Sequence, residues 1–208
     1  MCTRFYIEAE TEEVKEILDA VRSSRLADRF IKAGHAIRVS GEIRPTDVIP
    51  VLAPAKDGRR AAFPMQWGFL FPGKPPLVNA RSETAALKPA FQEAWYRHRC
   101  VIPASWYYEW EHFTDSSGKI KTGDKYMIQP RGYTMTYLAG LYCMEDGLAY
   151  FTVLTKEPTE DLKAIHDRMP LIFPPERIDE WLRPDSRPEE LLRYALTDMT
   201  AEKTTARM

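Results

Sequence analysis

The chain has 208 residues, which at about 150 residues per domain favours a single domain. Its 29 Lys and Arg residues nearly balance 30 Asp and Glu residues, so the net charge of −1 excludes a generally basic nucleic-acid coat protein but allows a local basic groove. The contents of 44% hydrophobic and 28% charged residues are enough for a packed core and argue against disorder, collagen-like repeats and coiled coil.

The first predicted element is an amphipathic helix over residues 12–21, with Thr11 as its N-cap. Its apolar residues follow the i, i+3, i+4, i+7 spacing of one helix face, at Val14, Ile17, Leu18 and Val21. The preceding segment, MCTRFYIEAE, has no apolar run of the kind found in secretory signals. No stretch approaches the length of a transmembrane helix, so we expect a cytoplasmic protein.

From about residue 36 to residue 155 the pattern predicts mainly strands. Short runs rich in β-branched and aromatic residues recur between turn signals, and they read AIRVS, VIPVLA, AAFPMQW, CVIPA, YYEW, KYMIQ, MTYLAGLY and LAYFTVL. Helical patterns return at residues 158–165, 176–182 and 188–195. We therefore predict an α+β fold in one domain over residues 1–196, with a mainly antiparallel sheet or irregular β-barrel and peripheral helices. Residues 197–208 lack apolar periodicity and are expected to form a mobile tail.

The three cysteines are Cys2, Cys100 and Cys143, an odd number without Cys-x-x-Cys spacing or a histidine at ligand spacing. This pattern argues against a zinc site or a disulfide framework, and we expect no metal and no cofactor. Cys100 and Cys143 lie in apolar runs typical of core thiols.

Four segments hold polar residues in apolar, turn-flanked surroundings: Cys2-Thr3-Arg4, residues 79–84, residues 105–110 and residues 165–170. Each residue alone also has a purely structural interpretation. Cys2 could lie at a frayed terminus, Asn79 could cap a helix, and Glu109 could lie on the solvent side of a strand. His166 and Arg168 could interact with a helix dipole.

Taken together, the segments resemble a known family. MCTRF at the start, WGF at residues 67–69, PPLVNARSET at 75–84, CVIPASWYYEW at 100–110 and IHDRMPLIF at 165–173 occur in this order. The combination is similar to the SRAP domain, the SOS response-associated peptidase family that processes abasic sites in DNA.

The resemblance implies that Met1 is removed and that Cys2 becomes the N-terminal residue. The α-amine could then form an imine with the aldehyde of a ring-opened abasic site, and the thiol could close a thiazolidine ring. An α-amine titrates at about 7.7–8.0, so a useful fraction is neutral at pH 7. The result would be a covalent DNA–protein crosslink.

The resemblance also assigns the other site residues. Glu109 resembles the catalytic acid/base that moves protons in imine formation and supports strand-cleaving β-elimination. His166 resembles the residue that protonates the sugar ring oxygen and helps to reverse the crosslink, a task suited to its pKa range. Asn79 resembles the residue that orients Cys2 and the deoxyribose.

The implied partner is single-stranded DNA, or a single-strand/double-strand junction, that contains an abasic site and is bound by a monomer. Arg81 and Arg168 resemble phosphate-binding residues, with Arg4 as a further candidate. The remaining DNA-binding candidates are one further backbone contact, Thr155, and two aromatic rings that could stack on bases, Trp67 and Trp106.

Two other functions remain open from the sequence. Cys2 with His166 and either Glu109 or Asn79 would formally satisfy the nucleophile, base and orienting group of an autoproteolytic or general cysteine peptidase. A non-enzymatic module that binds single-stranded DNA would leave Cys2 incidental.

Overall fold

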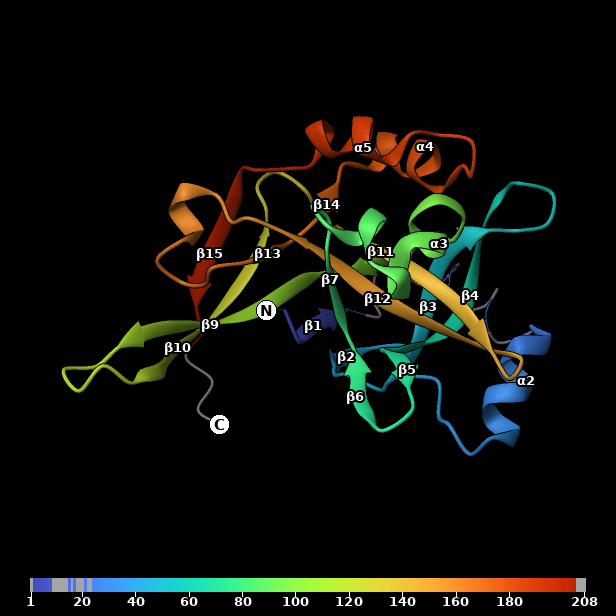
Figure 1. The fold of residues 1–208 in the computed structure, drawn as a ribbon, viewed down its shortest axis with the longest axis horizontal. Helices are drawn as coiled ribbons and strands as arrows, with labels where there is room; N and C mark the ends of the chain where they lie inside the picture. The colour runs from blue at the N-terminus through green and yellow to red at the C-terminus, as the bar shows by residue number, and fades with distance from the viewer. Residues whose placement is uncertain (1, 9–14, 16, 18–20, 22–23, 205–208) are drawn as a thin grey trace.

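Two β-sheets that share one core dominate the fold (Figure 1). The computed structural model describes residues 2–8, 15, 17, 21 and 24–204. It confirms the expected single α+β domain with mostly strands and a few helices. Among these residues, no helix combines the length and apolar character that crossing a bilayer requires.

The first sheet contains a closed five-stranded barrel. Its strands are β3 (Val48–Pro54), β4 (Arg60–Trp67), β8 (Arg99–Ala104), β11 (Thr136–Glu145) and β12 (Leu148–Lys156). The barrel closes because β11 pairs with both β8 and β12, while β12 also pairs with β4. All neighbours in the barrel are antiparallel except β12 and β4. Three short strands extend the sheet: β7 (Asn79–Arg81), β13 (Met169–Pro170) and β14 (Ile172–Phe173).

The second sheet has the strand order β15-β10-β9-β1-β2. Its strands are β1 (Arg4–Ile7), β2 (Gly41–Ile43), β9 (Trp106–Thr114), β10 (Ile120–Pro130) and β15 (Met199–Lys203). The long β9–β10 hairpin projects from one end of the molecule (Figure 1). Two further strands, β5 (Phe69–Phe71) and β6 (Lys74–Leu77), form a separate two-stranded ribbon.

The helices lie around the strands. The α-helices are α2 (Arg25–Lys32), α3 (Pro89–Arg97), α4 (Ile178–Leu182) and α5 (Pro188–Leu191). Single 3₁₀ turns are η1 (Ala85–Leu87), η2 (Glu160–Leu162), η3 (Pro175–Arg177) and η4 (Leu192–Tyr194). The buried Arg99 joins α3 to α4, because its guanidinium donates to the carbonyls of Trp95, Tyr96 and Trp181.

Several sequence predictions need correction. The expected mobile tail instead contains β15, which pairs with β10 from Tyr126↔Lys203 to Pro130↔Met199 and buries Met199. Only η2 forms within the predicted helix at 158–165. The helical patterns at 176–182 and 188–195 correspond to η3–α4 and α5–η4. The predicted helix over residues 12–21 falls mostly outside the described residues.

Candidate active site

Cys2 lies two residues before the start of β1 and is fully buried. The strand that follows it pairs with β2 on one side and with β9 on the other, which fixes the start of the chain inside the sheet. The Cys2 thiol donates a long hydrogen bond of 3.7 Å to the carbonyl of Arg4. Burial, followed by the nearby Glu109 carboxylate, raises the pKa of the Cys2 thiol well above its ordinary range. The resting sulfur is therefore a thiol rather than a thiolate.

Asn79 connects the N-terminal residue to the barrel sheet. It is the first residue of β7, which runs parallel to β12 with Asn79 opposite Val153. Its side-chain Nδ2 donates a 2.8 Å hydrogen bond to the carbonyl of Cys2. The other amide atom, Oδ1, is buried and has no hydrogen-bond partner within the described residues. Asn79 thus holds the Cys2 carbonyl and leaves a buried acceptor, Oδ1, available in the same region.

Glu109 lies on β9 and is only 4% exposed, which excludes the solvent-facing position considered from the sequence. Burial raises the pKa of its carboxyl from 4.5 to about 7. Two residues earlier on the same strand face, the buried Tyr107 phenol also has a strongly raised pKa, caused by burial and then by Cys2 and Glu109. These three groups consequently share one buried polar region.

His166 lies in the loop between η2 and β13 and reaches the same region from there. Its Nε2 lies 3.9 Å from Oε1 of Glu109, and the side chain is 6% exposed. Burial lowers the pKa of His166 from 6.5 to about 4, although Asp167 Oδ1 lies 2.8 Å from Nδ1 and opposes this shift. The backbone N–H of Arg168 also approaches Nδ1, at 3.1 Å, so Nδ1 is held by the loop while Nε2 faces Glu109.

Arg168 and Thr155 form a buried support for this loop. The Arg168 guanidinium donates to the Thr155 carbonyl and to the Glu83 carboxylate, each at 2.8 Å. Although burial opposes it, the bond from Arg168 lowers the pKa of Glu83. Thr155 is fully buried, and its carbonyl also accepts a bond from the Ser82 amide. Thr155 therefore lies beneath the surface behind Arg168, and not within reach of a DNA backbone as the sequence suggested.

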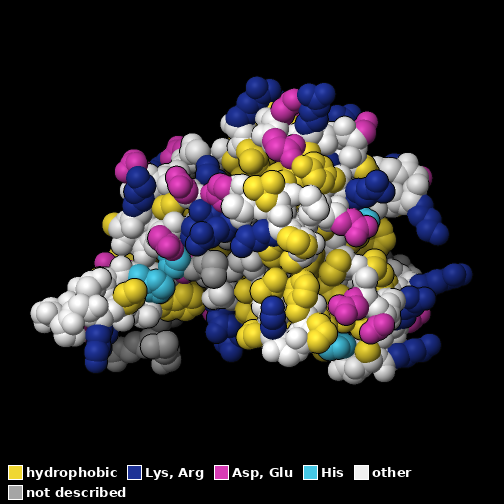
Figure 2. Space-filling view, viewed as in Figure 1, with side chains coloured by type: hydrophobic (Ala, Val, Ile, Leu, Met, Phe, Trp, Pro, Cys, Tyr) yellow, Lys and Arg dark blue, Asp and Glu magenta, His cyan; other side chains and the backbone are white. Residues whose placement is uncertain are grey.

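The other predicted DNA-binding residues divide into surface and core. Arg81 is exposed and forms no ion pair within the described part of the chain, whereas Arg4 pairs with Glu42 at 3.6 Å. Trp106 is partly exposed and stacks on Tyr6, with 4.7 Å between ring centroids. Trp67 is fully buried and donates to the Val78 carbonyl at 2.8 Å, which corrects its expected place on the DNA surface. Figure 2 shows Lys and Arg side chains gathered beside histidines near the base of the β9–β10 hairpin.

Sequence reasoning missed two residues of the site. Tyr107 belongs to the motif CVIPASWYYEW at residues 100–110. It is two residues from Glu109 on a strand, and this spacing predicts that the two side chains face the same side of the sheet. His112 received no role, yet its ring lies 4.7 Å from that of His166. Its backbone amide donates to the Ile165 carbonyl, which fixes the His166 loop against β9.

The four residues brought together from distant segments are the ones that the family resemblance marked. The family model for SRAP, the SOS response associated peptidase, matches residues 1–208. The chain belongs to the SRAP family. Among curated relatives, it is 30% identical to the abasic site processing protein YoaM of Bacillus subtilis, over 97% of this chain and 88% of that protein. It is 32% identical to YedK of Escherichia coli, another abasic site processing protein, over 64% of this chain and 60% of that one.

Solved structures show the same fold as this SRAP chain. A crystal structure of a protein from Bacteroides thetaiotaomicron aligns with a TM-score of 0.72 at 18% identity, covering 97% of this chain and 91% of that chain. A phage-related protein from Bordetella bronchiseptica aligns with a TM-score of 0.71 at 22% identity, over 99% and 95% of the two chains.

Proposed function

We propose that this protein processes abasic sites in single-stranded DNA by forming a covalent crosslink through Cys2 after removal of Met1. The observation that carries the proposal is the convergence of Cys2, Asn79, Glu109 and His166 from four distant segments into one buried polar region. Curated relatives that match nearly the whole chain are named abasic site processing proteins, which supports the same substrate class.

The proposed reaction uses both functional groups of an N-terminal cysteine. The free amine of Cys2 adds to the C1′ aldehyde of the ring-opened sugar, and loss of water gives an imine. The thiol then adds across the C=N bond, its proton passes to the nitrogen, and a five-membered thiazolidine results. Neither step requires an oxidant or a reductant, because one is a condensation that loses water and the other is an addition. All atoms of the product come from Cys2 and the sugar.

Glu109 is suited to the proton transfers of this sequence. With a pKa of about 7, its carboxyl exists in both protonation states near neutral pH. The protonated form can assist the departure of water from the carbinolamine, and the carboxylate can accept a proton from the thiol or from C2′ of the sugar. Removal of the C2′ proton is also the step that starts strand-cleaving β-elimination.

His166 supports ring opening of the sugar. Its low pKa keeps the imidazole neutral at pH 7, with Nε2 facing Glu109. The protonated Glu109 carboxyl supplies a proton to the imidazole, and the resulting imidazolium passes it to the ring oxygen and returns to the neutral form. The same pair can run the steps in reverse and release the crosslink.

The surface around the buried region supports binding of a single strand. Arg81 and Arg4 provide cations for phosphates, and Trp106 provides a partly exposed ring for stacking on a base. Arg168 contributes indirectly, because its guanidinium already holds Thr155 and Glu83.

The test is a denaturing gel of the protein mixed with single-stranded DNA that carries one abasic site. Mass spectrometry first confirms that Met1 is absent. A slowly migrating band that persists without added reductant and is lost in Cys2→Ala supports the proposal. The same DNA without the abasic site serves as the control. A band that persists in Cys2→Ala refutes the thiazolidine, and DNA binding without any band favours a non-enzymatic binding module.

A further inference from the structure

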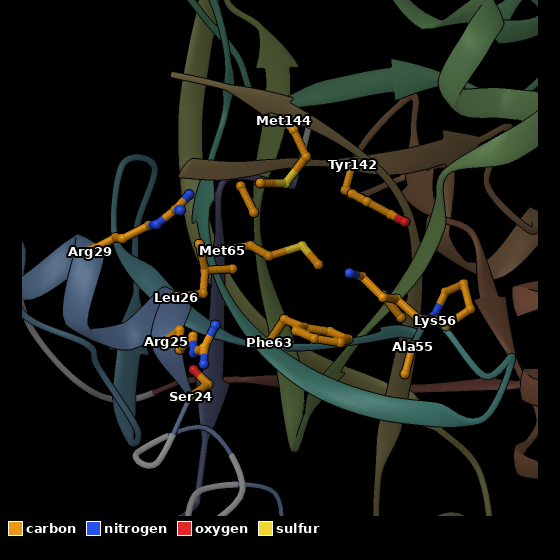
Figure 3. A pocket seen from close by; sticks show the side chains of 13 residues that line it. Ser24, Arg25, Leu26, Arg29, Ala55, Lys56, Phe63, Met65, Tyr142 and Met144 are labelled. Carbon is orange, nitrogen blue, oxygen red and sulfur yellow. The ribbon is translucent and has the colours of Figure 1, made fainter. Parts of the chain in front are cut away.

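A hollow lies where α2 meets β3, β4 and the β11–β12 hairpin (Figure 3). It has a volume of about 620 Å³ and opens to solvent. Its apolar lining includes Leu26, Phe63, Met65 and Met144. In Figure 1, α2 and the β9–β10 hairpin lie at opposite ends of the molecule, so this hollow is separate from the candidate active site.

Three cations surround this apolar lining. Arg25, Arg29 and Lys56 all line the hollow, and none of the described residues that line it carries a carboxylate. In Figure 3 the two arginines lie on one side of the hollow and Lys56 lies on the other. Arg29 donates to the carbonyl of Gly147, but none of the three cations forms an ion pair with any described residue. The hollow therefore has a positive rim without counter-ions from the described chain.

Some exposed cations elsewhere in the molecule have a carboxylate partner. Arg59 pairs with Asp57 at 2.7 Å, and Arg187 pairs with Glu190 at 3.0 Å. Arg25, Arg29 and Lys56 differ in that all three border one apolar hollow, where a bound anion would be partly shielded from water and more strongly attracted. Charge and shape thus indicate a ligand that combines several negative charges with an apolar part.

We propose that this hollow binds an acidic peptide segment of a partner protein. An apolar side chain of the segment enters between Phe63, Met65 and Met144, while its carboxylates pair with the three cations. Methionine side chains adapt to different apolar shapes and are common on surfaces that bind peptides. The volume accommodates one or two large side chains and leaves the peptide backbone at the open side.

The number of cations favours a peptide over a fatty-acid-like ligand. A fatty-acid-like molecule has one carboxylate and would leave two of the cations without partners. A DNA strand would offer phosphates to the cations and a planar base to the lining, so the experiment includes an oligonucleotide as a competitor. A peptide with several carboxylates beside an aliphatic or aromatic side chain matches both parts of the lining.

The experiment measures fluorescence anisotropy of a short labelled peptide in which aspartates flank a central Leu-Phe pair. The full chain should bind this probe, and Arg25→Glu combined with Lys56→Glu should weaken binding about tenfold or more. The control with equal charge change is Arg131→Glu combined with Arg187→Glu, two exposed cations outside the hollow, which should bind as the parent protein does. The exposed Met144 allows a separate test of the apolar part, since Met144→Ala should weaken binding without disturbing the core.

Three results would overturn the proposal. They are no binding of the probe to the parent protein, equal binding by the Arg25→Glu, Lys56→Glu variant, and displacement of the probe by decanoate or by an abasic-free oligonucleotide that binds more tightly. The proposal does not rest on abasic-site processing. The Arg25→Glu, Lys56→Glu variant should crosslink abasic DNA at the parental rate, so failure of one proposal leaves the other intact.

Discussion

The Nε2 atom of His166 lies 3.9 Å from Oε1 of Glu109, and the two side chains are 6% and 5% exposed. Burial moves their pKa values in opposite directions, up to about 7 for the carboxyl and down to about 4 for the imidazole. In water a Glu carboxyl has a lower pKa than a His imidazole, but in this site the order is reversed. Both side chains are therefore neutral between about pH 4 and pH 7. We therefore expect this pair to set the pH dependence of the site.

Glu109→Gln should alter the pH dependence of stability. Since the folded-state pKa of Glu109 is raised, the protonated carboxyl favours the folded state, and this contribution is complete below about 4.5 and lost as the pH rises through about 7. Gln cannot ionise, so the variant should gain stability over the parent at pH 8 by up to about 3 kcal/mol and gain little at pH 4.5. Urea unfolding at the two pH values measures this difference, and a gain that is equal at both would contradict the assignment.

Asn79→Ala should slow crosslinking while the protein stays folded. The change removes the 2.8 Å bond to the Cys2 carbonyl and the buried Oδ1 acceptor. We expect a rate loss of about tenfold or more, because the reacting residue is no longer held in place. Asn79→Asp is the matched comparison: it retains an acceptor but loses the donor to Cys2. Gel quantification of adduct against time gives the rates, and a parental rate in both variants would remove Asn79 from the positioning role.

Arg81→Ala and Arg168→Ala should separate DNA binding from stability. Arg81 is exposed, so its loss should change the unfolding free energy by less than about 0.5 kcal/mol while weakening binding to undamaged single strands and lowering the salt dependence by about one counterion. Arg168→Ala leaves the buried Thr155 carbonyl with one donor fewer and should cost about 2–3 kcal/mol of stability. Denaturant unfolding and salt titrations of DNA binding test the two variants. If Arg81→Ala lowered stability and Arg168→Ala only weakened DNA binding, Arg81 would be the structural residue and Arg168 the phosphate-binding one.

Deletion of residues 197–208 should destabilise the protein, because it removes β15 and exposes the edge of β10. Exposed strand edges pair with other chains, so the shortened protein should melt several degrees lower and associate as its concentration rises. Deleting only residues 205–208 is the control. Thermal melts and light scattering compare the two, and equal melting temperatures would show that β15 contributes nothing to the fold.

Local sequence patterns predicted most strands but few of their partners. Runs such as VIPVLA and LAYFTVL appear as β3 and β12 with nearly the expected bounds. The helix α3 was missed because its start at Pro89 lies inside a region rich in strand signals, although Phe91, Ala94 and Trp95 bury one face. The strand β15 was missed because its exposed polar residues give no apolar periodicity; backbone pairing with β10 orders it instead.

The candidate site could be predicted as a set of residues but not as a geometry. Motifs marked Cys2 and Glu109, while their proximity depends on pairing of β1 with β9, which lie about a hundred residues apart in the chain. The burial of Glu109 and Trp67 could not be predicted, because alternation along a strand does not say which face is covered by a distant segment. The segments that cover Glu109 include the loop that carries His166, which is bonded to β9 through the backbone amide of His112.

Assembly of the site from four segments has a consequence for the nascent chain. Cys2 is made first, whereas its partners at positions 79, 109 and 166 follow over most of the length of the protein. The long-range pairings that unite them form late in folding, because they close large loops. During synthesis the N-terminal cysteine is therefore an ordinary thiol without its acid/base group or its orienting amide. A chain that is truncated before residue 166, or misfolded, lacks the assembled centre, so the proposed capture of damaged DNA requires a molecule that has finished folding.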